Sequence, residues 1–237
     1  MNAHATTATP KGQQSMDATM YAEARNLMVD DQLRPSEITD SRILDTMRHL
    51  PRELCIRPDL QNAAYADTSL PLAQGRVLPQ PLLTARLVQA TNPHAHERVL
   101  VVGASTGYTA ALFAHLGLHV TALESNSLLA QAGQTFCQAY APTVVWHQAP
   151  LNKGVLDSAP YDLIYFDGCV AALPDFCNDQ LSAQGRVVGL LQRNTSLAEA
   201  FLAVREAGYS KPFRLTFLFE AQAPLLPDII PESAFSF

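Results

Sequence analysis

The most informative part of the sequence is Arg98-Val-Leu-Val-Val-Gly-Ala-Ser-Thr-Gly-Tyr108. Its run of aliphatic residues predicts a buried strand, and Tyr108 begins a helical pattern after the turn. Gly103 and Gly107 let the backbone turn sharply and let a ligand approach the N-terminus of that helix. The turn lacks the middle glycine of the dinucleotide-binding motif, and tight strand-to-helix turns also use glycine for steric reasons alone.

An acidic residue stands at the end of the next apolar run, His119-Val-Thr-Ala-Leu123, at Glu124. A carboxylate about twenty residues beyond a glycine turn can accept hydrogen bonds from both hydroxyls of a ribose. The alternative is a solvated strand end. Turn and acid together favour an adenosine-containing cofactor, which is either a dinucleotide or S-adenosylmethionine.

Short apolar runs alternate with helical patterns on both sides of this region, which is typical of a parallel, doubly wound sheet. Strands are expected over residues 98–102, 119–123, 143–146, 162–166, 186–191 and 213–219, and helices over 108–116, 127–140 and 196–207.

The chain of 237 residues, 48% of them hydrophobic, suits one core. Residues 1–18 lack apolar periodicity and are expected to form a disordered tail before a single domain at 19–237. Within that domain, 19–92 form a helical extension with a substrate loop, 93–210 the cofactor-binding core, and 211–237 the C-terminal strands and tail. The end of the tail, residues 229–237, is apolar enough to be expected to pack on the domain. In the extension, a helix starts near Met20, and a second is capped by Asp40 and ended by Pro51.

Composition excludes several classes of function. The formal charge of −6 and scattered basic residues argue against a nucleic-acid partner. No apolar run approaches the roughly 20 residues that span a bilayer, so no membrane partner is expected. The four cysteines form no zinc or disulfide pattern and are expected to be the reduced thiols of a cytoplasmic protein. The histidine pairs lack a third ligand, so no metal is expected either. The oligomeric state has no signal in the sequence.

Separate motifs between about Met20 and Leu191 share their order and spacing with one known family. They are Met28-Val-Asp-Asp-Gln-Leu-Arg34, Leu50-Pro-Arg-Glu53, Ala64-Tyr-Ala-Asp67, Leu70-Pro-Leu72, Gln80-Pro81, Ala159-Pro-Tyr-Asp162, Gln180-Leu181 and Gly185-Arg-Val187. Together with the strand and turn at 98–108, this set resembles the protein L-isoaspartate O-methyltransferase family.

The resemblance implies a Rossmann-like seven-stranded, doubly wound α/β sheet of the S-adenosylmethionine-dependent methyltransferase type, with N-terminal helices. It implies S-adenosylmethionine as cofactor and transfer of its methyl group to the free carboxylate of an isoaspartyl residue. The expected partners are isoaspartyl-containing peptides or proteins, or another carboxylate acceptor. An ionised carboxylate needs no strong base, so positioning can supply much of the catalysis.

The resemblance also assigns roles to positions of this chain. The cofactor-binding set is Gly103, Ala104, Ser105, Thr106, Gly107, Glu124, Ser125, Pro150, Leu151 and Asp167. The substrate set is Leu78, Pro79 and Gln80, and the catalytic positions are Pro79, Gln80 and, from its place after the fourth strand rather than from the resemblance, Asp167.

Four positions depart from the family pattern. Pro79 stands where the family has a hydroxyl residue, which removes both a side-chain and a backbone donor at the expected substrate contact. Val101 replaces an acid in the first strand, Ser105 the middle glycine of the turn, and Pro150 the Asp of a Gly-Asp-Gly motif. Each lost polar contact is expected to cost about 0.5–1.5 kcal/mol of cofactor binding.

A fifth difference adds an acid. Asp167 follows the fourth strand, where the family has a small or hydroxyl residue. At this end of an α/β sheet it could hold the cofactor's ammonium group or a cationic substrate. Alternatively it caps a helix at a strand-to-helix turn.

Three functional hypotheses remain. The first is an active carboxyl methyltransferase. The second is a catalytically altered member that keeps the fold and uses another acceptor or serves as a non-enzymatic binding protein. The third, a nicotinamide-dependent dehydrogenase, rests only on the glycine turn and Glu124.

Overall fold

The computed structural model describes residues 11–192, 197–205 and 213–229, with side chains from Ala18 onward. Of the tail end expected to pack on the domain, all but Ile229 lies outside these ranges. Its helices are α1 (Lys11–Leu27), α2 (Ser41–His49), α3 (Pro81–Ala90), α4 (Tyr108–His115), α5 (Ser127–Tyr140) and α6 (Phe176–Gln180), with a π-helical turn at Met28–Leu33. Its strands are β1 (Leu70–Pro71), β2 (Val77–Leu78), β3 (Arg98–Val102), β4 (His119–Glu124), β5 (Val145–Gln148), β6 (Tyr161–Val170), β7 (Leu181–Gln192), β8 (Ala198–Val204) and β9 (Arg214–Ala221).

The main sheet has seven strands in the order β5-β4-β3-β6-β7-β8-β9. The first five are mutually parallel, and β8 and β9 run antiparallel to their neighbours. The expected seven-stranded Rossmann-like sheet is therefore present. The strand order reverses between β3 and β6, and ligands of open α/β sheets bind outside the carboxyl ends of the strands at such a reversal.

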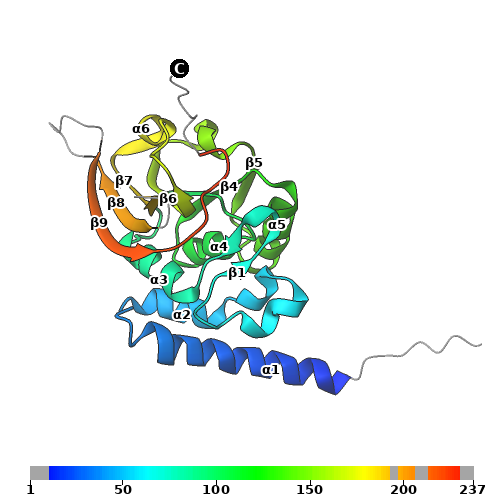
Figure 1. The fold of residues 1–237 in the computed structure, drawn as a ribbon. Coiled ribbons are helices and arrows are strands. Elements are labelled where there is room, and N and C mark those ends of the chain that lie inside the picture. The colour runs from blue at the N-terminus through cyan, green and yellow to red at the C-terminus, as the bar shows by residue number, and fades with distance from the viewer. Residues whose placement is uncertain (1–10, 193–196, 206–212, 230–237) are drawn as a thin grey trace, which may run out of the picture.

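Two cores cover the two faces of the sheet. Alternate residues of a strand point to opposite faces of the sheet. Val99 and Val101 of β3 therefore pack with the N-terminal helices and α4. Leu100 and Val102 pack with Phe176 in the core on the other face. The N-terminal helices form a layer beside the sheet (Figure 1). No helix in the described ranges is long and apolar enough to cross a membrane.

The N-terminal region is more helical than expected. Asp40 caps α2 by accepting from the Arg42 N–H, and the helix ends before Pro51, as predicted. However, α1 begins at Lys11, so part of the expected tail is helical. Gln, Met and Ala in that stretch are good helix formers, and residues 1–10 lie outside the described part.

The helix expected over residues 196–207 is wrong. Ala198–Val204 is strand β8, which pairs with β7 on one side and β9 on the other. Its apolar run satisfies a helical period, but both neighbouring strands supply ladder partners, and such tertiary pairing overrides local propensity. The strand expected over 213–219 is confirmed as β9.

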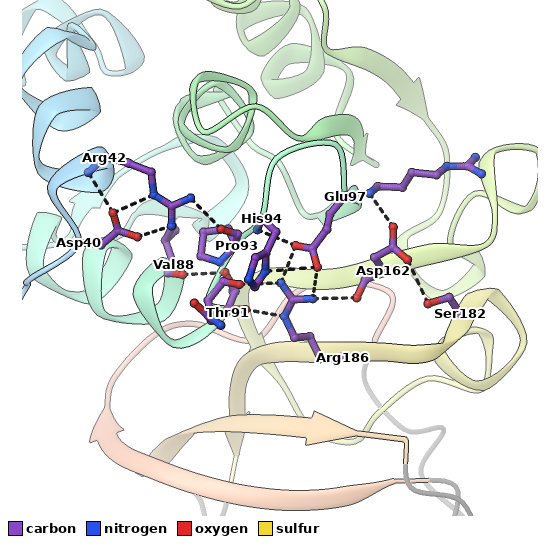
Figure 2. A network of polar contacts seen from close by, with 12 residues as sticks. Asp40, Arg42, Val88, Thr91, Pro93, His94, Glu97, Asp162, Ser182 and Arg186 are labelled. Carbon is purple, nitrogen blue, oxygen red and sulfur yellow. Dashed lines mark hydrogen bonds and ion pairs between the residues drawn. The ribbon is translucent and has the colours of Figure 1, made fainter.

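An ion-pair network holds the sheet at the amino ends of β3 and β6 (Figure 2). The Arg186 guanidinium donates to both oxygens of Glu97 over 2.8 and 2.7 Å and to the Thr91 carbonyl. Asp162 accepts from the Arg98 N–H at 3.0 Å. The network therefore ties β7 to the loop before β3, at the end of the strands away from the glycine turn.

Candidate functional site

The glycine turn, residues 103–107, connects β3 to α4 at the carboxyl edge of the sheet. Gly103 and Gly107 have φ angles of +74° and +87°, and Ser105 has +52°. The left-handed region is natural for glycine and uncommon for serine, so the turn keeps its shape although its middle glycine is absent. The Gly103 and Ala104 N–H groups donate to the Leu123 carbonyl over 2.9 and 3.0 Å, which fixes the turn against the end of β4.

Glu124 ends β4 beside this turn and is fully buried. Its carboxylate accepts from the Ser105 N–H at 2.8 Å and from the Asn126 N–H at 3.0 Å. Both oxygens also accept from Arg76 Nη1, over 3.1 and 3.0 Å. The acid is thus next to the glycine turn, as the sequence predicted, but its acceptor capacity is used within the chain.

Arg76 is a residue of this site that sequence reasoning missed. It lies between the 3-10 turn Ala73–Gly75 and β2 and is only 3% exposed. Besides its pair with Glu124, its Nη2 donates to the Gly103 carbonyl at 2.7 Å. The one available signal was a lone basic residue in the segment that precedes Gln80-Pro81.

Asp167 lies inside β6 and is nearly buried. Burial raises the pKa of its carboxyl group to about 6, while Arg76, the Thr109 hydroxyl and Arg52 act in the opposite direction. The helix-cap interpretation is wrong, because β6 continues to Val170 and no helix begins at Asp167. Its position supports a role at the reversal of strand order, beside the glycine turn.

Arg52 links the backbone at Pro79 to the first residue of α4, Tyr108. It is fully buried, its Nε donates to the Ala64 carbonyl at 2.9 Å, and its Nη2 donates to the Pro79 carbonyl. Its guanidinium lies 5.1 Å from the centre of the Tyr108 ring, where a cation is attracted by the face of the aromatic system. Burial lowers the pKa of Arg52 and raises that of Tyr108.

The expected substrate residues separate into two environments. Leu78 and Pro79 are buried. Gln80 is half-buried and lines a cavity of about 440 Å³ together with residues of β6, β7 and β8. All the side chains in this lining are neutral: Ser69, Gln80, Cys169, Gln192, Leu197, Ala198, Gln222, Ala223 and Pro224.

The remaining positions expected to bind the cofactor follow the ends of the parallel strands β4 and β5. Pro150 is exposed, Leu151 is fully buried, and the Leu151 N–H donates to Asp228 Oδ2 at 3.4 Å. Ser125 is half-buried at the start of the turn before α5. Within the described ranges, no three His, Cys, Asp or Glu side chains gather closely enough to hold a metal ion.

Side chains of Leu226 and Arg76 pack against the glycine turn at Gly103. A Cβ atom placed on Gly103 would lie 2.7 Å from Leu226 Cδ2 and 3.0 Å from Arg76 Nη2. A Cβ on Gly168 would lie 2.6 Å from the same Leu226 atom. In this conformation Arg76 and Leu226 therefore occupy the space beside Gly103.

Comparison with known proteins identifies the family. The family model described as protein-L-isoaspartate(D-aspartate) O-methyltransferase matches residues 23–209. A protein-L-isoaspartate O-methyltransferase of Methylorubrum extorquens is 35% identical over 70% of this chain and 73% of its own length. One from Herpetosiphon aurantiacus is 37% identical over 71% of this chain and 76% of its own.

Solved structures agree on the fold. A protein-L-isoaspartate O-methyltransferase superposes with a TM-score of 0.76 at 20% identity, covering 87% of this chain and 67% of that one. A putative member from Plasmodium falciparum, in complex with S-adenosyl-L-homocysteine, gives 0.71 at 16% identity, covering 86% of this chain and 98% of that one.

Proposed function

The chain belongs to the protein-L-isoaspartate(D-aspartate) O-methyltransferase family, and from this membership we propose that it methylates the free carboxylate of isoaspartyl residues in damaged proteins. The family is S-adenosylmethionine-dependent, and the cofactor supplies the methyl group. The ester product has a better leaving group than the carboxylate, so the neighbouring backbone nitrogen can close a succinimide that reopens to normal aspartate.

The structural feature that supports the proposal is the cavity beside Gln80. It lies at the carboxyl edge of the sheet, and its lining holds no charged side chain. An anionic acceptor would meet no carboxylate there, and the amide groups of Gln80, Gln192 and Gln222 offer N–H donors. These amides are candidates to orient the acceptor, since Pro79 carries no hydroxyl.

Asp167 belongs on the cofactor side of this arrangement rather than the acceptor side. It is buried beside Arg76 and Arg52 and is absent from the lining of the cavity. A carboxyl group with a pKa near 6 is mostly ionised at neutral pH, so it could accept from an ammonium group. The turn, Glu124, Ser125, Pro150 and Leu151 remain the proposed cofactor contacts.

We also propose that the protein is cytoplasmic. The four cysteines are unpaired thiols, all buried. Free thiols are usual in the reducing cytoplasm and uncommon outside it. This supports a cytoplasmic protein that encounters isoaspartyl proteins as they age.

The test is transfer of a tritiated methyl group to an isoaspartyl peptide, measured beside the same peptide with normal aspartate. We expect counts above background with the isoaspartyl peptide alone. Gln80→Glu should lower kcat/KM by about tenfold or more, because a carboxylate at this position repels the acceptor. Gln134→Glu, on the exposed face of α5, is the matched control and should leave kcat/KM unchanged. Equal counts for the two peptides would rule out the repair function.

A further inference from the structure

The C-terminal strap, residues 222–229, crosses the carboxyl edge of the sheet after β9 (Figure 1). It returns to β6, where Leu225 forms a parallel bridge with Cys169. The Cys169 N–H donates to the Pro224 carbonyl at 3.2 Å, and the Leu226 N–H donates to the Cys169 carbonyl at 2.7 Å. The strap is thus held to the sheet by a single bridged residue, not by a long ladder.

Leu226 is the residue of the strap that meets the glycine turn. It is 1% exposed and packs with the core that contains Leu151 and Phe176. Its Cδ2 would lie only 2.7 Å from a Cβ atom on Gly103 and 2.6 Å from one on Gly168. Glycines at such a turn leave room for a ligand to approach the backbone, and here that room holds an apolar side chain.

Arg76 occupies the polar half of the same region. Its side chain is 4% exposed and donates to Glu124, the acceptor proposed for the ribose, and to the Gly103 carbonyl. The buried Ser105 hydroxyl oxygen, by contrast, has no hydrogen-bond partner among the described residues. Such an orphaned polar atom in the turn is costly unless another partner arrives.

We infer that the chain closes its own cofactor site: Leu226 and Arg76 occupy the space and the acceptor that an adenosyl ligand needs, and binding requires the strap to withdraw. The inference rests on the proposed function, which supplies the ligand. Because only the open form binds, the apparent affinity falls by the fraction of molecules that are open. Removing the Leu226 side chain raises that fraction and therefore the affinity.

The experiment is calorimetric titration of S-adenosylhomocysteine and S-adenosylmethionine into the full chain and two variants. Leu226→Ala should bind at least tenfold more tightly than the parent. Leu218→Ala is the matched control, since it removes the same side-chain atoms from a partly exposed position of β9, outside the strap and the glycine turn. Its affinity should equal that of the parent.

Hydrogen exchange on the unmodified chain provides a second measurement that does not depend on a variant's folding. The Leu226 amide should exchange faster when S-adenosylhomocysteine is added, because withdrawal of the strap breaks its bond to Cys169. Equal affinities for parent and Leu226→Ala, with the Leu226 amide still protected in the complex, would overturn the inference and leave the proposed function standing. No binding by any of the three folded proteins would overturn the proposed function, and the inference with it.

Discussion

Arg76 and Glu124 form a buried ion pair in the candidate site. Both are buried, so each charge depends on the other for the stabilisation that water would otherwise give. Glu124 keeps two backbone donors of its own, Ser105 and Asn126. The sequence predicted the acid beside the turn because a strand pattern fixes where a strand ends. It could not predict the partner, since an ion pair between residues far apart in the chain leaves no local pattern.

This pair makes a prediction for stability. Arg76→Met should lower the free energy of unfolding by about 3–5 kcal/mol, because it leaves the Glu124 carboxylate buried without its counter-charge. The double variant Arg76→Met/Glu124→Gln should be less destabilised than Arg76→Met alone, because the neutral amide still accepts from Ser105. Urea unfolding of the parent, both single variants and the double variant measures the coupling. If the losses in unfolding free energy of the two single variants add up to that of the double variant, the two side chains do not depend on each other.

Asp167 gives a prediction in pH. Its folded pKa of about 6 lies above the ordinary carboxyl value of 3.8, so its contribution to stability is fully present below the unfolded pKa and is lost as pH rises through about 6. Asp167→Asn should therefore match the parent below about pH 4 and exceed its free energy of unfolding by about 3 kcal/mol at pH 8. Denaturant melts at both pH values test this. A variant that is less stable than the parent at pH 8 would mean that Arg76 and Arg52 outweigh the cost of burial.

At the scale of secondary-structure elements, most boundaries could be predicted because periodicity and punctuation agree. The helix at Ser127–Tyr140 matches its expectation at both ends. The helix prediction for Ala198–Val204 was wrong. Alanine, leucine and glutamate favour a helix, but the strands on either side provide hydrogen-bond partners that no local pattern reveals. The strap was missed for the same reason, since its packing depends on glycines far away in the chain.

The Arg186 network makes a prediction for how elements are joined. Arg186→Met should lower the free energy of unfolding by about 2–3 kcal/mol, because it leaves Glu97 partly buried without its charged donor. Arg57→Met is the matched control: Arg57 pairs with Asp59 while both side chains are exposed, so its loss should cost under about 1 kcal/mol. Thermal or urea unfolding of both variants measures these changes in the free energy of unfolding. Equal costs would mean that the network contributes no more than an exposed surface pair.

For the whole molecule, the fold is the one that the family implies. At the site, however, Glu124 and the glycine turn contact Arg76 and Leu226 of the same chain. The family resemblance carried by the motif order implied the seven-stranded sheet, and the structure has it. The closed state over the glycine turn could not be predicted, because it arises where the segment before β2, the turn and the strap meet in space. We therefore infer a methyltransferase whose cofactor site must open before the cofactor can bind.

A crystal structure of the chain soaked with S-adenosylhomocysteine tests this account most directly. We predict the ribose on the Glu124 carboxylate and the homocysteine part on the glycine turn, with Arg76 and Leu226 displaced from their positions. Ligand bound elsewhere or absent at high concentration, with the Arg76–Glu124 pair and Leu226 unmoved, would contradict it.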